Sequence, residues 1–284
     1  MLNLMMLSIV AGINDILAGA DPLVHAIFDP LRLQGVGSYW RITLASLLVH
    51  VALLYAFRPI SSLLFPRVFK RLSAADQQGW CVAMTAIVHT AFDTWFILKF
   101  ISHPALNSNK MDGHSAEFEF YLAIALGYYV WDLSTCIYNY SEYGIMYLIH
   151  GGLGVFGLLI LISRQLQFYA IPYLLPELSS VFLNIRHLLK YAGLSGSLVY
   201  KVNFAIFFAA YVVIRIGFEA YHSVKLVGYV YHHNTGKVFY PYAVFFAILG
   251  ITLTVLNTIW LRQIVNAAYY TLYPQSNKRK SKSN

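Results

Sequence analysis

The 284 residues are 58% hydrophobic and 11% charged, with 20 Lys and Arg against 12 Asp and Glu. An ordinary soluble chain has about 25% charged residues, so this composition excludes a soluble globular domain and predicts an integral membrane protein. The formal charge of +8 would favour nucleic acid as the partner of a soluble protein, but here the cations lie in short loops and a tail beside apolar segments. That pattern is typical of topology signals, so we expect no nucleic-acid partner.

The first 38 residues form an apolar N-terminal segment that differs from a secretory signal peptide. No basic region precedes the apolar run, and Asp15 interrupts it. A cleaved signal peptide has a positively charged start and an uninterrupted apolar stretch, whereas an amphipathic or re-entrant helix tolerates a carboxylate. We therefore expect residues 1–38 to lie at the luminal membrane face as an amphipathic segment.

Seven later windows each contain about 20 mostly apolar residues, the length that a helix needs to cross a bilayer. In chain order they are 39–57, 80–102, 117–138, 144–163, 166–188, 202–221 and 239–265. No polar linker divides them. The sequence therefore predicts one all-α integral membrane bundle of about seven transmembrane helices.

Lys and Arg are concentrated in the loops at 58–79 and 189–201 and in the polar tail, residues 271–284. Loops rich in these residues stay in the cytosol during membrane insertion. Together with the odd number of spans, this bias predicts a luminal N-terminus and a cytosolic C-terminus. The tail has too few apolar side chains to fold, and we expect it to be a basic cytosolic segment.

Polar side chains inside the predicted spans indicate which helix faces point inward. An ion exposed to hydrocarbon costs at least about 2.5–3.5 kcal/mol, so each ionisable residue must face protein or water. The residues concerned are His50, His89, Asp93, Asp132, His150, Glu177, Arg186, Arg215 and Glu219, with Asn184, Asn203 and Asn257 as uncharged companions. So many polar groups predict a polar or wet cavity. We expect no cofactor, and no metal site, because His222, His232 and His233 lack a Cys or carboxylate to complete a ligand set.

The fifth window, 166–188, carries polar residues at the spacing of one helical face. They are Glu177, Ser180, Asn184 and His187, at positions i, i+3, i+7 and i+10. Pro172 and Pro176 lie just before this face, and each removes a backbone donor, which predicts a bent helix whose carbonyls can line a cavity. Alternatively, Glu177 and Arg215 form a pair that only holds two helices together.

Asp132 and His150 lie in consecutive spans and suggest a catalytic pair. The Asp132 carboxylate could orient the His150 imidazole, as an aspartate orients a catalytic histidine. Alternatively, Asp132 caps a turn or pairs with an arginine, and His150 is a hydrogen-bonded packing residue. The glycines that follow His150, at positions 151, 152 and 154, leave room for the close approach of another helix or a lipid chain.

Three segments carry a resemblance to a known family: Gly127–Leu133, with the sequence Gly-Tyr-Tyr-Val-Trp-Asp-Leu; Met146–His150; and Glu177–Leu189. There the sequence resembles the TLC-domain family of membrane proteins, which includes ceramide synthases, and is most similar to the branch typified by TLC domain-containing protein 4. The resemblance covers residues 70–270 and leaves 39–57 as an extra transmembrane helix. It implies a six-helix barrel around a lipid-sized cavity, in the endoplasmic reticulum or a related membrane.

The sequence departs from the ceramide synthases of this family at both of their acyl-transfer motifs. Those enzymes carry a His-His pair and a later His-Asp followed by another Asp. Here a single histidine, His150, is followed by two glycines, and Glu177-Leu178-Ser179-Ser180 stands where the acidic motif is expected. We therefore expect the protein to be a lipid-binding protein rather than an enzyme of ceramide-synthase type.

The leading functional hypothesis is lipid homeostasis through a phospholipid, sterol or sphingolipid that the cavity senses, holds or moves. The expected lining residues are Glu177, Ser180, Asn184, Arg186, His187, Asn203, Arg215, His89 and Asp93. The alternative is an acyltransferase that takes acyl-CoA as substrate and uses His150 and Asp132. A membrane cargo receptor or chaperone is a further alternative, on family analogy alone. A homodimer is compatible with the sequence.

Overall fold

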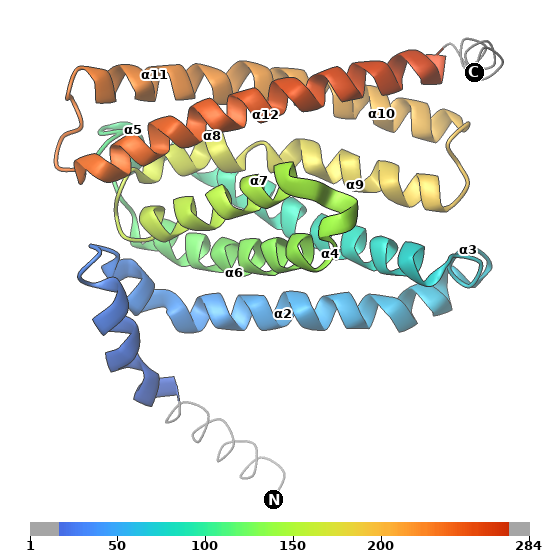
Figure 1. Cartoon of the computed structure of the whole chain (residues 1–284), viewed down its shortest axis with the longest axis horizontal. Coiled ribbons are helices and arrows are strands. Elements are labelled where there is room, and N and C mark those ends of the chain that lie inside the picture. Colours follow the sequence, from blue (N-terminus) through green and yellow to red (C-terminus); the bar gives the residue numbers. More distant parts are fainter. Residues whose placement is uncertain (1–16, 273–284) are drawn as a thin grey trace, which may run out of the picture. The chain divides into compact units, whose positions relative to one another are not determined.

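The computed structural model describes residues 17–272, and these residues form helices and connecting turns without a β-strand (Figure 1). After a short helix at Leu17–Phe28, the α-helices are α2 (Gln34–Leu64), α3 (Pro66–Phe69), α4 (Ala74–Phe100), α5 (Pro104–Asn107), α6 (Ala116–Tyr138), α7 (Tyr140–Leu161), α8 (Ala170–Leu174), α9 (Glu177–Tyr191), α10 (Leu198–Ala210), α11 (Ala220–Tyr231) and α12 (Tyr240–Leu272). A 3₁₀ turn, η1 (Gln167–Tyr169), precedes α8, and a π-helix, η2 (Tyr211–Glu219), joins α10 to α11. The predicted all-α fold class is confirmed.

Six helices in the described part of the chain are long and apolar enough to cross a membrane. They are Gln34–Leu64, Ala74–Phe100, Ala116–Tyr138, Tyr140–Leu161, Leu198–Tyr231 and Tyr240–Tyr269, and each contains one of the predicted windows or most of it. The chain is therefore a multi-pass membrane protein. Large apolar side chains on these helices, such as Val213 (67% exposed) and Val224 (71% exposed), are free to face lipid.

The remaining window, 166–188, is broken rather than continuous. It contains η1, α8 and α9, and Pro176 directly precedes α9. A proline has no N–H for the helical ladder and clashes with the preceding turn, which explains the break. The helical residues from 170 to 191 would still rise about 33 Å at 1.5 Å per residue, enough for a hydrocarbon core of about 30 Å.

The N-terminal segment contains a helix too short to cross a bilayer, Leu17–Phe28. Asp21 anchors it to α2 by accepting a hydrogen bond from Trp40 Nε1 at 2.9 Å and by pairing with Arg41. The predictions for residues 1–16 and for most of the basic tail fall outside the described residues.

The described helices belong to two compact units. The first comprises Met1–Leu53, Lys99–Ala170 and Gly236–Tyr242. Within it α6 and α7 lie side by side, and Tyr121 and Leu122 on α6 are fully buried (Figure 1). The connecting loops of this unit meet one another: Asp112 Oδ1 accepts from the Lys237 N–H at 2.8 Å, and Gln165 Oε1 accepts from the Phe239 N–H at 3.0 Å.

The second unit comprises Leu54–Leu98, Ile171–Thr235 and Ala243–Asn284. Within it α9 packs on α10, and α10, η2 and α11 follow one another as a single long helical run (Figure 1). Trp80 Nε1 on α4 donates to Ser61 Oγ on α2 at 3.0 Å, beside the buried ring of Phe69. Cys81 is buried in this unit and Cys136 in the first, and both are free thiols.

Candidate functional site

A network of buried polar side chains surrounds Arg215 in the second unit. Arg215 lies on η2 and is 8% exposed. Its guanidinium donates hydrogen bonds to Ser179 Oγ at 2.9 Å, to Ser180 Oγ at 3.0 Å and to the Pro176 carbonyl at 3.2 Å. All three acceptors lie at the start of α9, so the cation fastens η2 to the point where the helix is broken.

On its other side the network reaches α12 through Asn257, which is 1% exposed. Asn257 Nδ2 donates to Glu219 Oε1 at 2.9 Å, and Asn257 Oδ1 accepts from Arg215 Nη1 at 3.5 Å. The Tyr211 hydroxyl donates to the Asn257 carbonyl at 3.0 Å. The amide therefore links the cation and the buried carboxylate of Glu219, both on η2, to the neighbouring helix.

Glu177 adds a second carboxylate as the first residue of α9. Its side chain is hydrogen-bonded with Ser180, and the charge of Arg215 acts on it. A carboxylate at this position is favoured by the positive end of the helix dipole. Ser180 thus lies between the anion of Glu177 and the cation of Arg215.

Two residues of α4, His89 and Asp93, interact electrostatically with the network around Arg215. Their side chains are at most 1% exposed, and His89 Nε2 lies 3.1 Å from Asp93 Oδ1, one helical turn apart. The charges of both residues act on Glu177. His89 and Asp93 are therefore in contact with each other, within electrostatic reach of the Arg215 network.

The polar residues farther along α9 divide into two groups. Arg186 Nε donates to the Tyr200 hydroxyl at 2.9 Å, and Asn203 Nδ2 donates to the Phe182 carbonyl at 2.9 Å, so these two side chains fasten α9 to α10. Asn184 lies on the face that begins with Glu177, and its Nδ2 donates to the Ser180 carbonyl at 2.9 Å.

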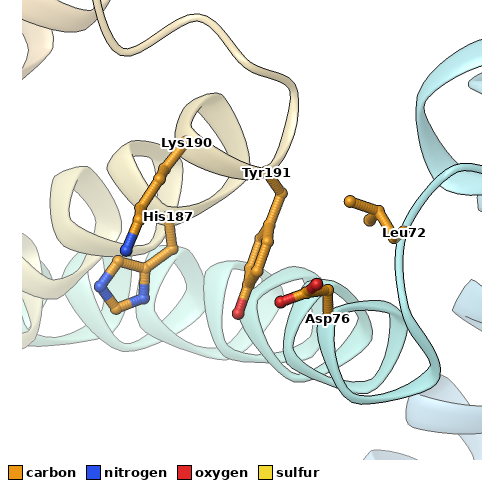
Figure 2. A pocket seen from close by; sticks show the side chains of 5 residues that line it. All are labelled: Leu72, Asp76, His187, Lys190 and Tyr191. Atoms are coloured by element: carbon orange, nitrogen blue, oxygen red, sulfur yellow. The ribbon is translucent and has the colours of Figure 1, made fainter.

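The last member of that face, His187, lines a pocket of about 460 Å³ at the C-terminal end of α9. The other lining residues are Leu72, Asp76, Lys190 and Tyr191. Figure 2 shows Lys190 and His187 side by side, with the Tyr191 hydroxyl and the Asp76 carboxylate facing each other beside them. Both charge signs are thus present in one open pocket.

Asp132 and His150 belong to the first unit and are half-buried, on α6 and α7. These two helices pack closely at this level: a Cβ atom at Gly151 would lie 3.2 Å from Leu133 Cδ1, and one at Gly154 would lie 2.6 Å from Tyr129 Cδ1. The predicted close approach of a helix to the glycines after His150 is present at positions 151 and 154.

The structure thus brings Glu177, Ser180 and Arg215 into one network, with His89 and Asp93 near it. Among the expected site residues it places His187 in a separate pocket. Sequence reasoning did not assign Asp76, Lys190 or Tyr191 to a site. Asp76 lies on α4, far from α9 in the chain, and Lys190 and Tyr191 lie beyond the end of the window 166–188 whose polar face predicted His187. The sequence feature that could have indicated this pocket is the pair of basic loops at 58–79 and 189–201.

Comparison with known proteins finds a family match and related sequences for most of the chain. The family model for the TLC domain matches residues 78–266. TLC domain-containing protein 2 of Danio rerio is 31% identical over 152 residues, which cover 52% of this chain and 61% of that protein, less than two thirds of its length. An uncharacterised TLC domain-containing protein of Schizosaccharomyces pombe is 25% identical over 235 residues, 77% of this chain and 78% of the other. TLC domain-containing protein 4-B of Danio rerio is 23% identical over 229 residues, 79% of this chain and 87% of the other.

Proposed function

Because the chain belongs to the TLC-domain family, we propose that it binds a membrane lipid among its transmembrane helices and acts in lipid homeostasis by sensing, holding or moving that lipid. The endoplasmic reticulum or a related membrane is the proposed location. The candidate lipids are phospholipids, sterols and sphingolipids, since each combines an apolar body with a polar end.

The polar face of α9 is the observation that carries this proposal. It begins at the buried carboxylate of Glu177, passes Ser180 and Asn184, and ends at His187 in the open pocket. Polar groups are costly inside a membrane domain and are retained where they serve a site or a pathway. A face of this kind suits a molecule with a polar end, whereas the exposed apolar side chains around it suit acyl or ring carbons.

Lipid extraction from the purified full-length protein tests the proposal. We expect mass spectrometry to find one lipid class enriched relative to the membrane from which the protein was taken. Asn184→Leu removes polarity from the middle of the α9 face and should reduce that enrichment. Val181→Leu, an apolar exchange one turn earlier on the same helix, is the matched control and should retain it. A lipid profile identical to that of the bulk membrane would contradict the proposal.

Acyl transfer is the second candidate function, favoured by the packing of α6 against α7 beside Asp132 and His150. In that reaction His150 would take the proton of an attacking amine, the amine would form an amide with the acyl carbon of acyl-CoA, and the thiol of coenzyme A would leave. Incubation with labelled acyl-CoA and candidate amines tests it. Turnover that His150→Ala abolishes would favour this function over lipid binding alone.

A further inference from the structure

The pocket at the C-terminal end of α9 combines a cation, neutral hydrogen-bond donors and an apolar edge. Lys190 supplies an ammonium group, and His187 supplies a further donor from the same helix, while the Tyr191 hydroxyl faces the Asp76 carboxylate (Figure 2). Leu72, in the turn before α4, supplies the apolar edge. A volume of about 460 Å³ is in the range of sites that hold small organic groups.

The chain segments that border this pocket are strongly basic. Residues 58–79 contain Arg58, Arg67, Lys70 and Arg71, with Asp76 as the one carboxylate, and residues 186–201 contain Arg186, Lys190 and Lys201 without any carboxylate. Basic clusters next to membrane-crossing helices attract anionic lipid head groups. The electrostatic field at the pocket therefore favours an anionic ligand.

Asp76 lines the pocket because it takes part in capping the N-terminus of α4. Ser73 Oγ donates to Asp76 Oδ2 at 2.7 Å and accepts from the Asp76 N–H at 3.1 Å. This exchange caps the first turn of α4, where the helix dipole favours a carboxylate. Lys190 remains as the charged side chain of the lining that can pair with a ligand.

Resting on the proposed lipid-binding function, we infer that this pocket holds the phosphate group of a phospholipid head group. Lys190 pairs with the phosphate, and His187 donates a hydrogen bond to one of its oxygens. The glycerol end lies toward Leu72. The pocket is formed where α4 begins and α9 ends, so the acyl chains can extend along the apolar surfaces of these helices.

The test uses the full-length protein in a non-ionic detergent and two fluorescent lipids with the same acyl chains. One is phosphatidylglycerol, and the other is diacylglycerol, which lacks the phosphate. We expect phosphatidylglycerol to bind about tenfold more tightly, since a charge-assisted bond to phosphate is among the strong ones. Lys190→Met keeps the side-chain length without the charge and should weaken phosphatidylglycerol binding about tenfold, with diacylglycerol binding unchanged.

Two further variants make the result specific to the pocket. Lys201→Met removes an exposed cation of the same basic region outside the pocket, so it should weaken phosphatidylglycerol binding much less than Lys190→Met does and leave diacylglycerol binding unchanged. Asp76→Asn keeps an acceptor for Ser73 and removes the negative charge, so it should bind phosphatidylglycerol severalfold more tightly. The tighter phosphatidylglycerol binding of Asp76→Asn tests the phosphate site even if Lys190→Met fails to fold.

The outcomes separate the head-group inference from the proposed function. Equal binding of the two lipids, or equal effects of Lys190→Met and Lys201→Met, would overturn the phosphate site and leave lipid binding standing. Millimolar inorganic phosphate that binds as tightly as phosphatidylglycerol and displaces it would identify a free-phosphate site instead. Failure of both lipids to bind would contradict the proposed function itself.

Discussion

Arg215 is held in the interior by neutral groups as well as by charge. Its guanidinium donates to two serines and a carbonyl of α9, while the carboxylates of Glu177 and Glu219 act on it electrostatically. Removal of a buried charge whose partners remain costs roughly 3–5 kcal/mol. We therefore expect Arg215→Met to lower the melting temperature of the protein in detergent by about 5–15 °C, measured by circular dichroism.

The control for this prediction is an exposed arginine on a neighbouring helix. Arg262 lies on α12 and is exposed, so Arg262→Met should change the melting temperature by no more than about 2 °C. Equal losses in the two variants would mean that the buried network contributes nothing specific to stability.

Helical spacing was enough to group Glu177 with Ser180, because residues three apart on one helix share a face whatever surrounds them. It could not group Asp76 with Lys190, since that neighbourhood depends on how α4 and α9 pack. Arg186 and Asn203 were expected among the lining residues because they are polar residues within predicted spans, and their side chains bond across the α9–α10 contact. The polarity of a residue predicts that its side chain avoids lipid, but it does not identify the group with which that side chain forms a hydrogen bond.

At the scale of the helices, the break before α9 and the π-helix η2 differ in how well the sequence predicts them. The break before α9 falls at Pro176, which has no N–H to donate to the helical ladder, although Pro59 lies inside the continuous α2. The π-helix η2 has no comparable signal in Tyr211–Glu219. Its wider turn places Arg215 and Glu219 in the buried network, and π-helical turns are frequent at functional sites. Such geometry depends on tertiary contacts that hydropathy does not encode.

The contact between α2 and α6 depends on a glycine. A Cβ atom at Gly127 would lie 2.4 Å from the Thr43 carbonyl oxygen and 2.5 Å from Ser46 Cβ. Ser46 Oγ donates to the Ile124 carbonyl at 2.7 Å across the same contact, so neither helix can move aside without losing a bond. Overpacking typically costs about 1–3 kcal/mol, and we expect Gly127→Ala to lower the melting temperature by several degrees, measured by fluorescence-detected thermal unfolding.

Gly152→Ala is the matched control for Gly127→Ala. A Cβ atom at Gly152 would meet nothing within 4 Å, and alanine is the better helix former by about 1 kcal/mol. Its melting temperature should therefore stay the same or rise. A loss as large as that of Gly127→Ala would show that the close approach of α2 to α6 is not the cause.

At the scale of the whole molecule, the number of membrane crossings depends on the broken segment from η1 to α9. Six helices qualify by length and composition, and the broken segment from η1 to α9 is the seventh predicted span. The loops around Asp112, Gln165 and Lys237 bond to one another in the first unit, so they lie at one membrane face. If the broken segment crosses, the turn between α9 and α10 lies at the other face.

Cysteine labelling decides this topology. We expect Ser195→Cys, exposed in the turn after α9, to react with a membrane-impermeant maleimide when only the plasma membrane is opened, because that turn belongs to the basic loops that the charge bias predicts to be cytosolic. Ser108→Cys, exposed near Asp112, should react only after the internal membranes are dissolved. The unchanged protein is the control and should stay unlabelled, since Cys81 and Cys136 are buried. Labelling of both positions from the cytosol would put the turn after α9 at the same face as the loops around Gln165 and Lys237. Neither the segment broken at Pro176 nor Leu198–Tyr231 would then cross the membrane, and the predicted count of seven spans would be wrong.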